Sequence, residues 1–338
     1  MRVTIGILGC LFLALTAAGC GTDSTGDTGT GGSAGAGTGG SGGAGGSTLD
    51  GAADAPQGDM RPCEGSTLAN GKFTLMHAGI SYGYHVHVPP SYDGTKRTPL
   101  LVNWHGLGSD GVQQQLFTNA NLVSDEQGFI VVYPDGPDRS WAAGTCCSMF
   151  LDGGGMPDRD DVGFASALVA EISKAACIDS KRVYSTGMSN GGFMSHRLAC
   201  EAAGVFAAIA PVAGKMGVAD CRPSRPISVI HFHGTADETI LYDSPALSGE
   251  NVDVPEMMKR WADRNGCTKG PDATYQMGSV TCQTWSQCTG GVLVSLCTAE
   301  GMGHCWPGTA FCPGGKPFTT DISASRDGWT FMHQFVLP

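Results

Sequence analysis

Basic residues are scarce in this chain. Its 338 residues include 20 Lys and Arg against 31 Asp and Glu, so the formal net charge at pH 7 is −11. A surplus of negative charge is repelled by phosphate backbones and by anionic lipid surfaces. We therefore expect no nucleic-acid partner and no binding to a membrane through surface charge.

Metal-binding patterns are missing as well. The 14 cysteines form no C-x-x-C pair and the 9 histidines show no His-x-x-x-His spacing, so a zinc site is not indicated. The acidic run from Asp152 to Asp161 offers carboxylates that would suit calcium, but it lacks the EF-hand spacing. Asp160 or Asp161 is well placed to cap a following helix, so we expect a cap and no metal site.

The N-terminus has no apolar run long enough to cross a bilayer. Arg2 precedes an apolar stretch from Ile5 to Ala18, which leads into Ala17-Ala18-Gly19-Cys20. This pattern predicts a signal peptide over residues 1–20, and its final cysteine resembles a bacterial lipoprotein junction, although Ala17 stands where Leu is usual. We expect an exported bacterial protein, either extracellular or at the cell surface through lipidation of Cys20. An ordinary signal peptide cleaved nearby is the alternative.

Residues 21–60 contain no Lys, Arg or aromatic residue and are rich in glycine. Such a segment cannot bury apolar surface, so we expect a disordered linker followed by a single catalytic domain over residues 61–338. A flexible tether suits an anchored protein, so this segment favours the lipid anchor, which would be the only membrane contact.

Twelve cysteines remain after Cys10 and Cys20, and an even number in an exported chain favours disulfides. Four of them cluster in the region just before His304 and are expected to cross-link a loop-rich section: Cys267, Cys282, Cys288 and Cys297. The neighbours Cys146 and Cys147 are expected to pair with separate partners.

The pattern G-x-S-x-G carries the chemistry of this sequence. A β-branched and aromatic stretch beginning at Val183 runs into Gly187, Ser189 and Gly191, and a helical pattern follows. In this context a tight strand-to-helix turn exposes the serine hydroxyl, and only glycine fits on either side. Ser189 is therefore the predicted nucleophile, and the N–H of Asn190 at the helix start is a predicted oxyanion-hole donor.

Two downstream loops supply the partners that a nucleophilic serine needs. Asp237 follows a strand that begins near Ile227, with Glu238 beside it as a rival, and His304 lies in a glycine-rich loop after a strand from Val292. The order Ser, Asp, His is the order of α/β-hydrolases. We expect His304 to act as the base and Asp237 to orient it.

A further buried strand, Leu100 to Trp104, ends in His105-Gly106. The loop after the third strand is where a second oxyanion-hole donor is expected, and we assign it to Leu107, with Gly108 as the alternative. His105 is expected to brace this loop and is kept as a low-ranking candidate for the substrate pocket.

Strand and helix patterns alternate along the rest of the domain. Two antiparallel strands (Lys72 to Leu75 and Tyr82 to Val88) precede strand and helix patterns over residues 100–104, 112–127, 129–133, 161–176, 182–186 and 325–336. This alternation predicts an α/β fold with a mostly parallel central sheet flanked by helices and with antiparallel strands at the N-terminus.

Six motifs occur together in one order. They are W-H-G-L-G (104–108), Y-P-D-G (133–136), D-D-V-G-F (160–164), R-V-Y-S-T-G-M-S-N-G-G-F-M (182–194), H-F-H-G-T-A-D (231–237) and G-H-C-W-P-G (303–308). The chain from about Gly71 onward thereby resembles the polyhydroxybutyrate depolymerase family of esterases, which includes feruloyl and acetylxylan esterases. The resemblance implies an α/β-hydrolase fold, no cofactor and hydrolysis of carboxylic esters through an acyl-enzyme. It also assigns Ser189, Asp237 and His304 as the triad.

One position departs from the family pattern, because Cys305 stands where many relatives have Thr, and it indicates an extra disulfide near the site. Trp141 and Trp306 are candidates to pack on an acyl group, although either could belong to the core.

The resulting functional hypothesis is an exported serine esterase that acts on feruloyl or acetyl esters of plant polysaccharide. The alternative within the class is a depolymerase of hydroxybutyrate oligomers or polymer. A serine peptidase and a non-catalytic surface-binding protein are the alternatives from other classes.

Overall fold

The computed structural model describes residue 63, residues 68–147 and residues 159–338. The expected signal peptide, Cys20 and the linker lie outside the described residues. So does the part of the acidic run from Asp152 to Asp158. Asp160, which is described, caps the following helix by accepting a hydrogen bond from the Gly163 N–H, as expected.

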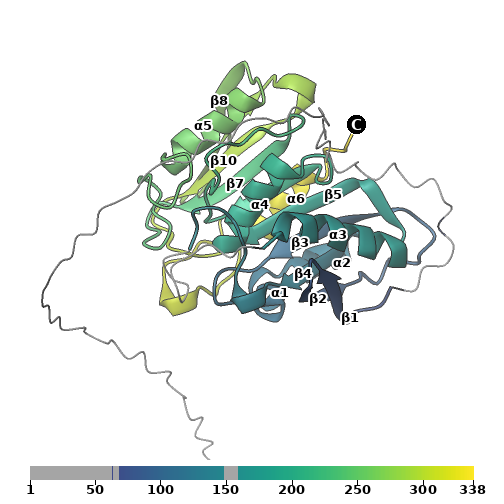
Figure 1. Cartoon of the computed structure of the whole chain (residues 1–338). Coiled ribbons are helices and arrows are strands. Elements are labelled where there is room, and N and C mark those ends of the chain that lie inside the picture. The colour runs from purple at the N-terminus through teal and green to yellow at the C-terminus, as the bar shows by residue number, and fades with distance from the viewer. Residues whose placement is uncertain (1–62, 64–67, 148–158) are drawn as a thin grey trace, which may run out of the picture. The chain divides into compact units, whose positions relative to one another are not determined.

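The described chain alternates strands and helices (Figure 1). The strands are β1 Gly71–His77, β2 Ile80–His87, β3 Thr98–Trp104, β4 Ile130–Asp135, β5 Ile178–Met188, β6 Ala208–Val212, β7 Ser228–Gly234, β8 Lys269–Met277, β9 Val280–Ser286 and β10 Val294–Ala299. The α-helices are α1 Gly111–Thr118, α2 Ala120–Gln127, α3 Asp161–Ala175, α4 Asn190–Glu201, α5 Val254–Arg264 and α6 Ala324–Met332.

All ten of these strands form one sheet in the order β1-β2-β4-β3-β5-β6-β7-β10-β9-β8. The six central strands from β4 to β10 run parallel to one another. The pairs β1–β2 and β2–β4 at one end of the sheet and β10–β9 and β9–β8 at the other end are antiparallel. The predicted α/β fold and the antiparallel N-terminal strands are confirmed. Parallel strands deliver their carboxyl ends to one edge, which is where ligand sites of such sheets form.

Helices cover both faces of this sheet (Figure 1). Residues of α2 and α6 share one buried cluster with the side chains of Ile230 and Phe232 from β7. Residues of α4 and α5 share another with Val229 of the same strand. Because strand side chains alternate between faces, successive residues of β7 belong to opposite layers.

The segment expected as one helix over residues 112–127 is two helices. Asn119 separates α1 from α2 with a φ of 53° and a ψ of 22°, a left-handed conformation that ends the first helix. Asparagine tolerates this conformation better than most residues do.

The cysteine-rich section before His304 is ordered differently from the expectation. Instead of loops, it forms the antiparallel hairpin β8–β9, and its cysteines pair as Cys267–Cys288 and Cys282–Cys297. The expectation for Cys146 and Cys147 is wrong, because these neighbours pair with each other. The other disulfides are Cys63–Cys177, Cys200–Cys221 and Cys305–Cys312.

Within the described part of the chain, no helix has the length and apolar character needed to cross a membrane.

Candidate functional site

Ser189 stands at the tip of a sharp turn between β5 and α4. Its φ of 55° and ψ of −121° are unusual for a residue with a side chain, and its N–H donates to the Val212 carbonyl at 2.9 Å. Such conformations persist only where the surroundings enforce them, and they are frequent at functional sites. The turn lies at the carboxyl end of the central strand β5.

The glycines on both sides of Ser189 are required by close backbone packing. A Cβ on Gly187 would lie 2.6 Å from the Gly191 carbonyl oxygen, and one on Gly191 would lie 2.1 Å from the Trp104 carbonyl oxygen. Neither position has room for another side chain. The steric reason expected for G-x-S-x-G is thus present in the packing of β5, α4 and the end of β3.

Asp237 and His304 are joined by a hydrogen bond. Asp237 follows β7, His304 follows β10, and the distance from His304 Nδ1 to Asp237 Oδ2 is 2.7 Å. The other carboxylate oxygen of Asp237 accepts from the N–H groups of Thr239 and Ile240, both at 2.8 Å. Because this carboxylate is ionised, the proton at Nδ1 faces it and Nε2 is left to face a reacting group.

The surroundings of Asp237 favour its charged form. Burial acts to raise the pKa of Asp237, but the hydrogen bond and charge of His304, with contributions from His233 and the Ile240 N–H, outweigh it and lower this pKa. The rival Glu238 is mostly exposed and pairs with Lys316 instead. Of the two adjacent acids, Asp237 alone contacts His304.

A cavity of about 850 Å³ opens above Ser189 and His304, and both residues line it. Its other walls are largely apolar and come from the loop after β3, from α1 and from the loop after His304. The apolar lining residues are Leu107, Leu116, Phe117, Met188, Ala310, Phe311 and Pro313. The structure therefore brings the predicted nucleophile and base together in one pocket of a size typical for small-molecule ligands.

Of the predicted oxyanion donors, Leu107 lines this cavity, and Asn190 directly follows Ser189, which also lines it. The N–H of the alternative to Leu107, Gly108, already donates to the Arg139 carbonyl at 2.8 Å. Among the described residues, none accepts a hydrogen bond from the Leu107 N–H. Asn190 begins α4, where the first backbone N–H groups have no partner inside the helix. The geometry favours Leu107 over Gly108 for the first donor.

The Asn190 side chain also has a structural role that the sequence did not reveal. Its Oδ1 accepts from the Trp141 N–H at 2.7 Å, and its Nδ2 donates to the Trp141 carbonyl at 3.1 Å. Nδ2 also lies 3.5 Å from the Cys146 Sγ, which belongs to the Cys146–Cys147 disulfide. Asn190, the residue after Ser189, thus connects the start of α4 to the loop after β4.

The three candidates for the substrate pocket are not on the cavity wall. His105 is buried, with Nδ1 2.7 Å from the Gly106 carbonyl and Nε2 accepting from the Gly136 N–H at 3.0 Å, so it braces its loop. Trp141 is buried and donates from Nε1 to the His105 carbonyl at 3.0 Å. Neither residue lines the cavity, so the structure gives no support to their candidacy for the substrate pocket.

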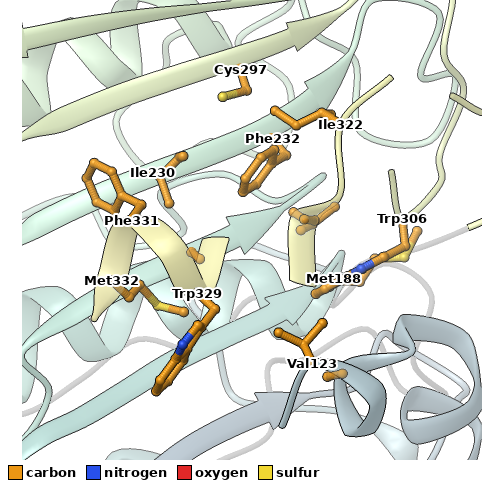
Figure 2. Close-up of a cluster of buried hydrophobic side chains, with 14 of the residues drawn as sticks. Val123, Met188, Ile230, Phe232, Cys297, Trp306, Ile322, Trp329, Phe331 and Met332 are labelled. Atoms are coloured by element: carbon orange, nitrogen blue, oxygen red, sulfur yellow. The ribbon is translucent and has the colours of Figure 1, made fainter. Parts of the chain in front are cut away.

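Trp306 belongs to the core beneath the site. It is buried in the cluster that also contains Met188 and Trp329 (Figure 2), and its Nε1 donates to the Ser325 Oγ at 3.1 Å. The sequence could not separate this role from a pocket role, because a tryptophan near the base fits either. The aromatic residues that do line the cavity are Phe117 and Phe311, whose rings are 6.0 Å apart and edge-on.

Cys305 forms the extra disulfide that its position indicated. It pairs with Cys312, and the closed loop between them carries Thr309, Ala310 and Phe311 into the cavity wall. The structure therefore links the base and the apolar wall through one covalently closed loop.

No group of three or more His, Cys, Asp or Glu residues suited to a metal ion occurs within the described ranges.

Comparison with known proteins agrees with this arrangement. The profile of a family described as Esterase PHB depolymerase matches residues 81–246, which include the elbow and Asp237. A putative esterase, NocK of Nocardia uniformis subsp. tsuyamanensis, is 30% identical over 259 residues, covering 70% of this chain and 74% of that protein. The chain belongs to the PHB depolymerase family of esterases.

Other members of this family are longer proteins. Feruloyl esterase B of Piromyces equi is 32% identical over 75% of this chain and 45% of its own length. The bifunctional acetylxylan esterase/xylanase of Neocallimastix patriciarum is 27% identical over 77% of this chain and 34% of its own length. The chain thus spans less than half the length of these two relatives.

Solved structures agree with the fold of the family. An acetyl xylan esterase from Aspergillus awamori superposes with a TM-score of 0.54 at 18% identity, covering 78% of this chain and 98% of that one. A thermostable esterase gives a TM-score of 0.52 at 19% identity, covering 79% of this chain and 63% of that one. These likenesses show an α/β-hydrolase fold.

Proposed function

We propose that this protein is a serine carboxylesterase that uses Ser189, His304 and Asp237 as its catalytic triad. The observation that carries the proposal is the shared cavity: a serine at a strained elbow and a histidine bonded to a buried carboxylate line one pocket. Membership of an esterase family supports the same chemistry.

The first half of the reaction forms an acyl-enzyme. The Ser189 Oγ attacks the ester carbonyl carbon while His304 Nε2 takes its proton, and Asp237 stabilises the imidazolium that forms. The carbonyl oxygen becomes an oxyanion, which the N–H groups of Leu107 and Asn190 stabilise. When the tetrahedral intermediate collapses, the C–O bond to the alcohol breaks and His304 returns the proton to the leaving alkoxide.

The second half releases the acid. Water gives a proton to His304 Nε2 as its oxygen attacks the acyl carbon, and the same N–H donors hold the second oxyanion. The bond to the Ser189 Oγ then breaks and His304 returns the proton to that oxygen. The net reaction consumes one ester and one water and needs no cofactor.

The cavity favours a bulky apolar acyl group. Phe117 and Phe311 offer aromatic surface beside Ser189, and Leu116 and Leu107 extend it. An aromatic ring gains from stacking or edge-on contact with such side chains, whereas an acetyl group would leave most of this wall unused. We therefore propose feruloyl esters of plant polysaccharide as the preferred substrates and acetyl esters as weaker ones.

The alternative in the class is a depolymerase of hydroxybutyrate oligomers or polymer. The same apolar wall would accept a short aliphatic acyl unit, and the description of the family names this chemistry. The two substrates differ in whether they use the aromatic rings of the cavity, so their relative rates separate the two functions.

We further propose that the protein acts outside the cytoplasm. All twelve cysteines after residue 20 are paired in the structure, which suits an oxidising compartment. Lipidation of Cys20 stays a prediction. Mass spectrometry of the mature N-terminus from the native host would test it, because a diacylglyceryl group on Cys20 supports the anchor and a cut elsewhere contradicts it.

The test of the function is hydrolysis of methyl ferulate, an acetylated xylan and hydroxybutyrate oligomers. In Ser189→Ala we expect kcat to fall by at least roughly 10⁴-fold, because the nucleophile is absent. Ser109→Ala is the matched control, since Ser109 lines the same cavity away from the elbow and its loss should leave activity nearly unchanged.

Each outcome has a distinct meaning. Fastest turnover of methyl ferulate supports the feruloyl assignment, and fastest turnover of the oligomers supports the depolymerase. Activity on peptide amides in place of esters would indicate a peptidase. Activity on none of these substrates, or activity that survives Ser189→Ala, would contradict the proposed triad and favour a non-catalytic binding protein.

A further inference from the structure

A row of buried polar rings crosses the layer between α5 and the sheet. Trp261 of α5, His196 of α4, and His231 and His233 of β7 are all fully buried. The successive distances are 3.2 Å from Trp261 Nε1 to His196 Nδ1, 3.3 Å from His196 Nε2 to His231 Nδ1, and 3.0 Å from His231 Nε2 to His233 Nδ1. The two imidazoles of β7 lie on the same face of the strand as Val229, whose aliphatic side chain packs in the cluster with α4 and α5.

The two ends of this row fix its direction. The indole of Trp261 can only donate, so His196 Nδ1 must accept. At the other end His233 Nε2 lies 2.7 Å from the Ile240 carbonyl, which can only accept. One arrangement satisfies every atom: each histidine is neutral, carries its proton on Nε2, and accepts at Nδ1.

Burial also keeps these rings uncharged. Burial lowers the pKa of His196 to about 3, with the nearby charge of Arg264 acting in the same direction. It lowers the pKa of His233 to about 4, although Asp237 and the Ile240 carbonyl oppose the shift, and that of His231 falls as well, with Lys215 contributing. A protonated ring would have two donors and would break the row.

The row ends at the loop that carries Asp237. His233 Nε2 bonds to the Ile240 carbonyl and lies 3.5 Å from Asp237 Oδ2. The N–H of the same residue, Ile240, donates to Asp237 Oδ1 at 2.8 Å, and so does that of Thr239. The His233 side chain therefore fixes the loop at Ile240, the residue whose N–H donates to the Asp237 carboxylate.

We propose that Trp261, His196, His231 and His233 are positioning residues for Asp237, and that their one-way hydrogen bonds hold the Asp237 loop against β7. The proposal rests on the proposed function, in which Asp237 orients His304. None of the four lines the cavity above Ser189. They act through the geometry of the carboxylate, and a misplacement of a catalytic group by about 1 Å can cost on the order of 100-fold in rate.

The first test measures the tautomers directly and needs no activity. Long-range ¹H–¹⁵N spectra of the ¹⁵N-histidine-labelled protein at pH 7 should show three imidazoles protonated at Nε2 and slow to exchange with solvent. The exposed His333 provides an internal contrast. A proton on Nδ1, or a charged ring, at any of the three buried positions would overturn the proposed direction.

The second test separates positioning from general stability. In His196→Gln the side-chain amide can accept from Trp261 and donate to His231, whereas the thioether of His196→Met has no donor and accepts only weakly. We expect kcat for the best ester to fall roughly ten-fold in His196→Met with KM within about two-fold, and to be largely restored in His196→Gln. Equal kcat in both variants and the wild type would overturn the proposal.

Trp261→Phe keeps the test decisive if His196→Met does not fold. It removes the N–H that starts the row and should lower kcat by about three-fold, while Trp329→Phe, on the opposite face of the sheet, should change stability alone. Unchanged kcat in Trp261→Phe would contradict positioning. Failure of the triad itself would appear differently, as a Ser189→Ala variant that retains activity.

Discussion

The two sides of the cavity are built in opposite ways. On the side of Asp237 and His304, the carboxylate is buried and is held by hydrogen bonds from His304 and from two backbone N–H groups. On the facing side, Leu116 and Phe311 line the cavity with side chains that are 75% and 65% exposed. One side is fixed by the interior of the protein and the other is open to solvent.

This difference suggests separate tasks for the two sides: the side of Asp237 and His304 serves the reaction, and the apolar side selects the ester. In our proposal, the groups that transfer the proton are held by the backbone around Asp237 and by the buried rings next to it, so their geometry depends on the fold. The apolar wall depends on a few side chains of α1 and of the loop closed by Cys305–Cys312. Changes on the first side should affect all esters alike, and changes on the second should affect esters with bulky acyl groups.

The largest effect is expected from Asp237→Asn. Loss of the charge removes the stabilisation of the imidazolium and disturbs the His304 tautomer, so kcat should fall by about 10⁴-fold for every ester. Steady-state kinetics would measure it, with Glu238→Gln as the neighbouring control that keeps activity. If Glu238→Gln were the impaired variant, the assignment of the acid would be wrong.

The buried rings should make stability sensitive to acid. His196 and His233 have pKa values of about 3 and about 4, below the ordinary 6.5. The unfolded chain therefore binds more protons below pH 6.5, and the stability present above that pH is lost as the pH falls towards the folded values. Each ring should cost about 2 kcal/mol of unfolding free energy between pH 7 and pH 5.

Denaturant titrations at several pH values would measure this loss. His196→Gln removes one of the titrating rings, so its unfolding free energy should change less steeply with pH than that of the wild type. An equal slope in the two proteins would show that His196 does not bind its proton more weakly in the folded state.

On the open side, Phe311→Ala should act selectively. Loss of one aromatic contact should lower kcat/KM for methyl ferulate by about five-fold and leave that for a small acetyl ester nearly unchanged. Phe318→Ala is the control, because Phe318 is an exposed phenylalanine outside the cavity lining. Equal losses for both esters would contradict a role in acyl selection.

The smallest effect is expected from opening the loop between Cys305 and Cys312. The double variant Cys305→Ala with Cys312→Ala should lower kcat/KM for methyl ferulate by about two-fold, since Phe311 is no longer held in place. The Cys267→Ala with Cys288→Ala variant removes a disulfide away from the cavity lining and should keep the same kinetics. Unchanged kinetics in the Cys305→Ala with Cys312→Ala variant would show that other contacts hold the loop, and an equal loss in both variants would show a general effect of losing a disulfide.

The sharp turn at Ser189 and the pairing of Asp237 with His304 could be predicted because their constraints are local. The packing of Gly187 and Gly191 leaves a sequence signature, and Asp237 and His304 each follow a strand whose apolar pattern is plain. The parallel sheet then brings these strand ends to one edge. Most of the geometry on the side of Asp237 and His304 could therefore be predicted from the sequence.

The rest depends on tertiary packing that leaves no periodic pattern. β8 is an exposed edge strand that contains Pro271, so it shows no alternation of apolar residues. Trp141 and Trp306 look alike in sequence whether they face the cavity or the core, and only the structure places them in the core. The row from Trp261 to His233 joins three elements far apart in the chain.

The most direct test of the proposed active site is labelling with an organophosphate, followed by peptide mapping. The account predicts a single adduct on Ser189, none in Ser189→Ala, and much slower labelling in Asp237→Asn, because the base is then poorly oriented. An adduct on another residue, or no adduct on a folded protein that hydrolyses esters, would contradict it.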